Sequence, residues 1–287
     1  MMSGFVIGII LLSSLLHASW NALVKAGEDK WLTPAVICAF SAIFGLIAAI
    51  ILPLPHSHHW PWIIASGCLH LTYFTLLVIA YGLGDFSRVY PIARGTSPLL
   101  VFIAAGPVLG ESLKVESGLA IMLVVVGVMS LAWDRNLFIK KQGKAVLYAI
   151  LTGAAIAAYS ITDASGLRIM SNDIEHATFV YLAWIMIVAC VPFVLVVGYI
   201  RWGKITPYLI SYGLRSSGGA LFALISYALI LWAYSKAPAA PVAAIRETGV
   251  IFAAIIGALT LREKFGIRQI PAAILVTLGA AGLHLTN

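Results

Sequence analysis

Charged residues are scarce in this sequence. Asp, Glu, Lys and Arg together make up 10% of its 287 residues, whereas a soluble domain carries about 25%. Hydrophobic residues account for 61%, and apolar stretches long enough to cross a membrane recur from one end of the chain to the other. This composition excludes both a soluble globular protein and a soluble domain with a single membrane anchor. It predicts a polytopic membrane protein.

Cysteines and the short motifs of known chemistry are also few or absent. The three cysteines, Cys38, Cys68 and Cys190, lie in apolar runs and form no CxxC pair, so we expect neither a disulfide framework nor a zinc centre. The sequence has no GxxxxGK[ST] phosphate loop, no GxSxG nucleophile motif and no HExxH pair. We therefore expect no ATP-driven transport by this chain alone, no enzymatic activity and no cofactor.

The excess of basic residues has an explanation in membrane topology. A formal net charge of +7 in a soluble protein could indicate a nucleic-acid partner. Here the Lys and Arg residues lie in short loops between apolar runs, so we expect no such partner. Thirteen of the 18 fall on one side of the predicted membrane and three on the other, which places both termini outside the cytoplasm.

Ten membrane-spanning helices account for the apolar stretches. The first lacks a preceding basic segment and has about membrane length, so we interpret it as a span and not as a signal peptide. The connections are too short to contain a soluble domain, and they predict antiparallel neighbours. The predicted spans are approximately residues 3–24, 32–52, 61–82, 86–109, 115–133, 144–163, 177–199, 214–235, 238–261 and 267–286.

Three pairs of identical residues are separated by the same offset of 152 positions. The pairs are Arg94 and Arg246, Glu111 and Glu263, and Gly127 and Gly279. We infer a duplication, with a first half at residues 1–137 and a second at 138–287, each containing five spans. Because five is odd, the second half enters the membrane from the opposite side. The predicted fold is an all-α integral membrane protein made of two inverted five-helix repeats around a central cavity, an arrangement typical of secondary transporters.

The arginines of the first pair are the leading candidates for a substrate site. An arginine at the centre of a span costs about 2.5–3.5 kcal/mol on insertion scales, and such residues usually face a cavity or a partner. Tyr90, Arg94 and Ser97 share one helix face, and Pro91 and Pro98 free backbone carbonyls beside them. We predict that this face contacts substrate. The alternative for Arg94 is a structural ion pair.

Two carboxylates inside or at the end of predicted spans are further candidates for the site. Arg246 and Glu247 are adjacent, so their side chains diverge by about 100° around a helix and should not pair with each other. We predict that Arg246 binds a substrate carboxylate and that Glu247 receives an ammonium group or titrates. Asp163 is a second candidate for proton coupling, and its alternative is a cap or loop charge at a helix end.

Aromatic and polar residues on other spans complete the candidate site. Trp20 and Asn21 share a helix face with His17, and tyrosines deep in later spans require hydrogen-bond partners. Helix packing is the alternative for each. The predicted substrate-binding residues are Trp20, Asn21, Tyr73, Tyr90, Arg94, Ser97, Tyr159, Arg246 and Glu247. The residues predicted for proton coupling are His70, Asp163 and Glu247.

The segment His56-Ser57-His58-His59 resembles a metal-binding loop in its composition. A stable site also needs further ligands, and neither a carboxylate nor a second cluster lies close by in the sequence. We therefore interpret this segment as a hydrated turn at the membrane surface and expect no metal site.

Three short segments point to a family. They are HASWNALVK (His17–Lys25) and two helix endings, PVLGESL (Pro107–Leu113) and LTLREKF (Leu259–Phe265). Together they resemble the EamA repeat of the drug/metabolite transporter superfamily over nearly the whole chain. The resemblance implies ten helices in two inverted repeats and secondary transport of metabolites, often export. Length, basic loops and aromatic content are also similar to those of the bacterial amino acid exporters of that family, including exporters of aromatic amino acids, which implies a bacterial inner-membrane location.

The resemblance leaves several properties open. The second copy of the first pattern, GAAIAAYSITDASG (Gly153–Gly166), has no Trp-Asn pair, so equal roles for the two halves are not expected. Family members commonly have cytoplasmic termini, which is opposite to the result of the charge rule. The expected substrates are amino acids, with sugars, nucleotide sugars, phosphonates or drug-like cations as the alternative, followed by a channel or a membrane enzyme. We expect alternating access, coupling to protons or facilitated flow, and a monomer or weak homodimer.

Overall fold

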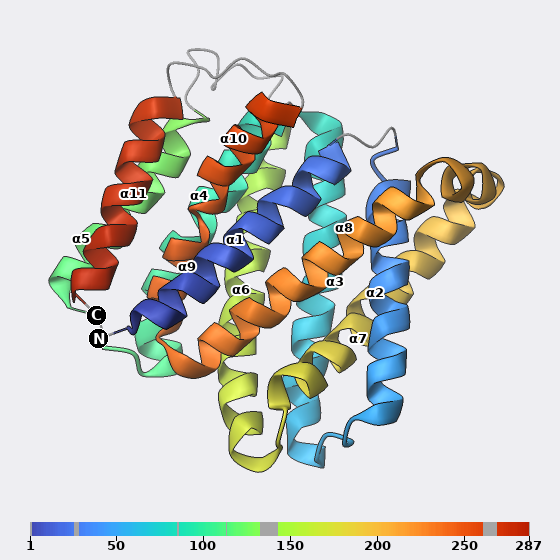
Figure 1. The fold of residues 1–287 in the computed structure, drawn as a ribbon, viewed down its shortest axis with the longest axis horizontal. Coiled ribbons are helices and arrows are strands. Elements are labelled where there is room, and N and C mark those ends of the chain that lie inside the picture. Colours follow the sequence, from blue (N-terminus) through green and yellow to red (C-terminus); the bar gives the residue numbers. More distant parts are fainter. Residues whose placement is uncertain are drawn as a thin grey trace.

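The structure is a computed structural model that describes residues 2–25, 29–84, 86–112, 114–132, 143–260 and 269–286. Within these ranges the chain is helical and contains no strand (Figure 1). The elements are α1 (Gly4–Lys25), α2 (Leu32–Ile51), the 3-10 turn η1 (Ser57–His59), α3 (Trp60–Leu83), α4 (Phe86–Leu109), α5 (Val115–Ser130), α6 (Gly143–Asp173), α7 (Ala177–Ile200), α8 (Trp202–Lys236), α9 (Ala239–Arg246), α10 (Gly249–Thr260) and α11 (Gln269–Thr286).

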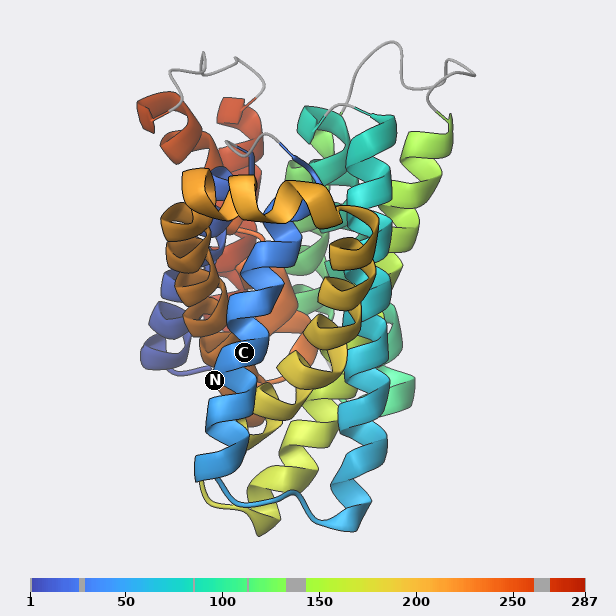
Figure 2. The same ribbon diagram turned by 90° about the vertical axis from the view of Figure 1, so that its right-hand side faces the viewer.

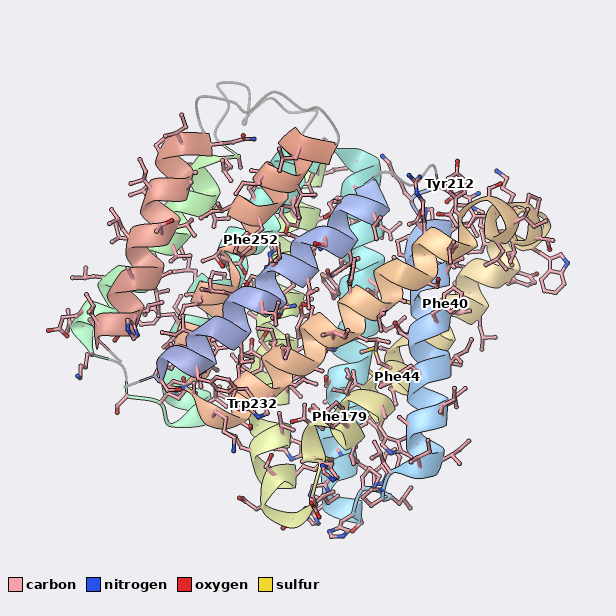
Figure 3. All side chains as sticks on the ribbon, viewed as in Figure 1. Phe40, Phe44, Phe179, Tyr212, Trp232 and Phe252 are labelled. Atoms are coloured by element: carbon pink, nitrogen blue, oxygen red, sulfur yellow. The ribbon has the colours of Figure 1, made fainter. Side chains whose placement is uncertain are left out.

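The helices form a bundle suited to a lipid bilayer. In the described residues, nine segments are long and apolar enough to cross a membrane, with α9 and most of α10 counted as one, and α5 is a shorter apolar helix. Large apolar side chains point outward around the bundle, among them Phe44 and Phe179 (Figure 3). Helices that are apolar on all faces are expected of membrane spans. The predicted all-α membrane fold is confirmed.

Both ends of the chain lie on the same side of the bundle. α1 begins and α11 ends there (Figure 1), as an even number of crossings requires. We call this end of the bundle the termini side and the other end the opposite side. Lys114, Arg168 and Lys236 lie toward the termini side, and Lys30, Lys144, Arg201 and Lys204 are among the basic residues that lie toward the opposite side.

Four of the main helix pairs join the two predicted halves. α1 packs along α8, and their counterparts α6 and α3 pack along each other in the same way. α2 packs against its own counterpart α7, and α5 against α11. A Cβ atom on Gly127 would lie 2.9 Å from Cβ of Leu275, and one on Gly279 would lie 2.6 Å from the carbonyl oxygen of Ala120. The matched glycines therefore allow the α5 and α11 backbones to cross closely.

Two helices are longer than predicted. α6 continues to Asp173 instead of ending near residue 163, so Asp163 lies inside the helix and is fully buried. This removes the helix-cap alternative for Asp163. α8 starts at Trp202 and has 35 residues, which at about 1.5 Å per residue exceeds the hydrocarbon core of about 30 Å. Figure 2 shows that its first part lies across the bundle at the opposite side.

The span predicted at residues 238–261 is broken in the middle. α9 ends at Arg246 and α10 begins at Gly249. Between them, the N–H of Thr248 donates to the carbonyl of Ile245 at 3.0 Å, a tighter turn than the α-helix. The carbonyl of Arg246 accepts a hydrogen bond from Oγ of Ser14 on α1 at 3.1 Å. A break at this depth persists only where protein or a wet cavity satisfies the backbone, as in the discontinuous helices of transporters.

Candidate functional site: a cationic, aromatic cavity

A cavity of about 330 Å³ extends into the bundle from the opposite side. Its lining begins at the exposed Lys30 and at Gly84, near the helix ends, and reaches Tyr159 and Arg246 halfway through the bundle. The lining residues come from α1, α2, α3, α6, α7, α8 and α9. Both predicted halves therefore contribute walls to one chamber.

Aromatic rings form much of the inner wall. The rings of His70 and Tyr159 stack with centroids 4.0 Å apart and an interplanar angle of 24°. Tyr227 meets His70 edge-on at 5.2 Å, and Tyr73 meets Tyr159 edge-on at 5.7 Å. Such pairs are favourable arrangements for aromatic quadrupoles. The wall also includes Trp20, Phe74 and Tyr81.

Arg246 provides the positive charge at the inner end of the cavity. The helix break places it at the last residue of α9, and its guanidinium carbon lies 5.7 Å from the ring centroid of Tyr227, within the range of a cation–π contact. Its buried Nε has no hydrogen-bond partner. In the described part of the chain, no carboxylate forms an ion pair with Arg246. A buried guanidinium in this state has the charge and the N–H donors to bind an anion.

Arg94 has a different environment, although it occupies the equivalent place in the other half. Its Nε lies 2.9 Å from Oε2 of Glu247, and both side chains are almost completely buried. The distance is that of an ion pair, but neither atom meets hydrogen-bond geometry. Neither residue belongs to the cavity lining. The structural ion pair that was the alternative for Arg94 is present in the structure.

Asp163 lies behind the cavity wall. Its Oδ1 accepts hydrogen bonds from Oγ of Ser66 and, at 3.3 Å, from the hydroxyl of Tyr181, and its Oδ2 accepts one from the hydroxyl of Tyr227. Tyr227 itself lines the cavity. Ser66 also connects to His70, whose Nδ1 lies 3.3 Å from Oγ of Ser66 and 2.9 Å from its carbonyl oxygen. A short polar chain therefore links a fully buried carboxylate to two residues of the wall.

The structure divides the predicted site residues into two groups. Those on the cavity wall are Trp20, Asn21, His70, Tyr73, Tyr159 and Arg246. Those buried outside the lining are Tyr90, Arg94, Ser97, Asp163 and Glu247. The side chain of Lys25 and the residue Glu263 lie outside what the structure describes. The wall residues of α2 and α7, such as Cys38 and Met186, were not predicted, because small and apolar side chains give no signal of a cavity.

Comparison with known proteins assigns the fold and the general activity. The sequence profile of the EamA-like transporter family matches residues 143–285. The chain carries an EamA-like transporter domain. A crystal structure from another protein superposes with a TM-score of 0.72 at 15% sequence identity, covering 99% of this chain and 97% of that one, which shows a shared fold. No curated protein matches the chain. With its apolar helices, this EamA-like protein is a multi-pass membrane transporter of small molecules.

In this EamA-like transporter, a polar network closes the termini side. Nη2 of Arg168 on α6 donates to Oε1 of Glu111 at 2.7 Å and to the carbonyl of Ala237 at 3.1 Å. The N–H of Ala239, the first residue of α9, donates to the same Glu111 oxygen at 2.8 Å. Glu111, which follows α4 of the first half, thereby caps a helix of the second half. The network joins the two halves at the end away from the cavity mouth.

Replacing Glu111 with glutamine should loosen this closed end, because the amide loses the charge that binds Arg168 and caps α9. The cavity-lining cysteines Cys38 and Cys190 report on it: a membrane-impermeant maleimide applied to the termini side of sealed vesicles should label them severalfold faster in the variant. The exposed Cys68 is replaced by serine throughout. The matched control is Glu116→Gln, an exposed glutamate at the start of α5. Equal labelling rates for Glu111→Gln and the control would contradict the role given to Glu111.

Proposed function

We propose that this protein is an alternating-access exporter of amino acids, including aromatic ones. The observation that carries the proposal is a guanidinium at the inner end of an aromatic cavity that pairs with no carboxylate among the residues the structure describes. Arg246 would bind the substrate carboxylate, and Trp20, Tyr73 and Tyr159 would contact the substrate side chain. Asn21 would offer hydrogen-bonding groups beside them. Rocking of one half against the other would expose the site to the termini side.

Size and surface chemistry support this substrate class. A volume of about 330 Å³ is at the lower end of the range of small-molecule sites, which are mostly apolar with a few placed polar groups. Arginine binds a carboxylate through two parallel N–H groups, which fixes its orientation as well as its charge. Aromatic walls bind rings and aliphatic side chains without demanding one shape.

A second candidate is an aromatic carboxylate that has no amino group. Among the described residues that line the cavity, none is Asp or Glu, whereas Lys30 and Arg246 are basic. Glu247, which the sequence suggested for an ammonium group, is paired with Arg94 instead. An ammonium group would therefore meet ring faces and neutral oxygens only. The same cationic lining disfavours drug-like cations as substrates.

We also propose a direction of transport and a path for the coupled proton. The charge rule places the opposite side, where the cavity opens, in the cytoplasm, and an exporter would load its substrate there. Asp163 would carry the coupled proton, because it lies one hydrogen bond behind Tyr227 of the wall, and His70 would relay it through the hydroxyl of Ser66. A reporter fused to residue 287 tests the orientation, and activity of the reporter in the cytoplasm would reverse the loading side.

A set of three related compounds tests the substrate proposal. Liposomes containing the protein are preloaded with L-phenylalanine, 3-phenylpropanoate or 2-phenylethylamine, which share a ring and carry the zwitterionic, anionic and cationic groups. Each compound is labelled in turn and offered to liposomes preloaded with the same compound, and we expect counterflow of labelled phenylalanine and none of the labelled amine. Exchange with phenylpropanoate alone would favour the second candidate. Exchange with the amine alone, or with sugars but none of the three, would overturn the assignment of Arg246 as the carboxylate site.

A further inference from the structure

A second polar cluster lies on the termini side, far from the cavity. It consists of His56, His58, His59 and Asp173, whose potential metal-ligand atoms all lie within 4.8 Å of one another. Nε2 of His58 is 2.7 Å from Oδ2 of Asp173, and Nε2 of His59 is 3.1 Å from the same oxygen. The carboxylate that the sequence did not place beside the histidines is therefore present in the fold.

The cluster joins the two halves of the molecule. His58 and His59 are residues of η1, His56 directly precedes it, and Asp173 is the last residue of α6. The rings are crowded, with centroids of His58 and His59 only 4.1 Å apart and those of His56 and His59 at 5.5 Å. His58 and Asp173 are accessible to water, whereas the side chain of His59 is completely buried. A dissolved ion can therefore reach the cluster from the surface of the protein.

The hydrogen bonds suggest different roles for the three rings. Nδ1 of His59 accepts the backbone N–H of His56 at 3.2 Å, so in the neutral ring Nε2 carries the hydrogen and donates to Asp173. His59 therefore orients the carboxylate in the manner of the outer partners of metal ligands. His56, His58 and Asp173 remain as direct ligands, a set of two imidazoles and one carboxylate that leaves room for water.

We propose that His56, His58 and Asp173 bind a divalent transition-metal ion of the zinc class, with His59 as the orienting residue. Imidazole nitrogens favour zinc, copper, nickel or cobalt over magnesium and calcium, which prefer oxygen ligands only. Tetrahedral bonds of about 2.0–2.1 Å place ligand atoms about 3.3 Å apart. Small rotations of the exposed His56 and His58 rings bring the atoms of the cluster to that spacing.

The position of the site gives the bound metal a consequence for transport. The metal would join the start of α3 to the end of α6 beside the network of Glu111 and Arg168, on the side away from the cavity mouth. It would therefore hold this side closed and slow the transport cycle. This second step rests on the proposed alternating access, whereas binding of the metal does not.

Titration calorimetry of the full chain, purified in detergent without a histidine tag, tests the binding. ZnCl₂ is the probe, and MgCl₂ is the comparison ion. We expect one zinc ion per chain, no heat from magnesium, and at least tenfold weaker zinc binding in His58→Ala and in Asp173→Asn. His176→Ala is the matched control, because His176 is an exposed histidine of the same region outside the cluster, and it should bind zinc like the wild type.

Further outcomes separate binding from folding and from transport. Thermal unfolding without metal should give the same midpoint for His58→Ala as for the wild type. Weaker zinc binding by the variant would then reflect the lost ligand and not a loss of structure. No zinc binding by the wild type, or equal affinity in Asp173→Asn, would overturn the site. In proteoliposomes, zinc should slow counterflow of the wild type and not of Asp173→Asn. Zinc binding without this inhibition would reject the effect on gating and leave the site itself established.

Discussion

The Arg246→Ala variant should lose counterflow of carboxylate substrates while retaining its fold. Arg246 lines the cavity and pairs with no carboxylate in the described residues, so its removal leaves no buried partner charge behind. A hydrogen bond to a charged group contributes about 1.5–3 kcal/mol, which corresponds to about 10- to 100-fold in affinity. The substrate affinity of Arg246→Lys should fall between that of the wild type and that of Arg246→Ala, because lysine keeps the charge but lacks the planar guanidinium with its parallel N–H groups.

The measurement is counterflow of labelled phenylalanine, together with titration calorimetry of the same compound. Lys204→Ala is the control, since Lys204 is exposed on the same side of the bundle and does not line the cavity. Wild-type affinity in Arg246→Ala would show that the anion site lies elsewhere. Loss of transport with unchanged affinity would assign Arg246 to a conformational step instead of substrate binding.

The Glu247→Gln variant should be strongly destabilised, for a different reason. Glu247 is the ion-pair partner of Arg94, and both side chains are almost fully buried. Removing one member of a buried pair leaves an uncompensated charge, which typically costs about 3–5 kcal/mol. Replacing both residues with methionine removes both charges, so the double variant should unfold at a higher temperature than Glu247→Gln. The midpoint of thermal unfolding in detergent measures the difference.

The same double variant tests whether the pair contacts substrate. Retained counterflow in Arg94→Met with Glu247→Met would establish a purely structural role for both residues. Loss of counterflow in a stable double variant would return them to the substrate path predicted from the sequence. Wild-type stability in Glu247→Gln would show that Arg94 has another partner and would contradict the expected cost of breaking the pair.

The sequence predicts the bundle well because its signals are local. Apolar runs of membrane length mark the helices, and one offset of 152 residues relates Gly127 to Gly279, which the structure places at the crossing of α5 and α11. The break after Arg246 was not predicted. Its backbone is satisfied by Ser14 of α1, a contact between residues far apart in the chain, and no local pattern records it.

The different environments of the two arginines also depend on one local difference. Residue 95, the counterpart of Glu247 at the 152-residue offset, is glycine, and it packs against Met129, whose Cγ would lie 2.6 Å from an added Cβ. These matched positions therefore supply one carboxylate beside two arginines, and Glu247 pairs with Arg94. The absence of a second carboxylate is visible in the sequence. Which arginine is left to the cavity depends on packing between the halves.

The histidine cluster shows the limit of sequence reasoning more sharply. Asp173 is separated from His58 by 115 residues, and it reaches the cluster only because α6 is longer than its apolar stretch suggested. A polar helix end beyond the hydrocarbon core has no hydropathy signal. The three-dimensional proximity of ligands that are distant in sequence therefore had to come from the structure.

The hydroxyl of Ser14 has one hydrogen, and it is shared between the carbonyl of Ile10 at 2.8 Å and that of Arg246 at 3.1 Å. If α1 separates from α9 during the cycle, the Ser14 hydroxyl keeps an acceptor within its own helix, whereas the Arg246 carbonyl loses the hydroxyl as its donor. That oxygen then needs a solvent molecule, since an unsatisfied carbonyl in a membrane interior costs several kcal/mol. Hydration of the inner end of the cavity at Arg246 and separation of α1 from α9 must therefore occur together.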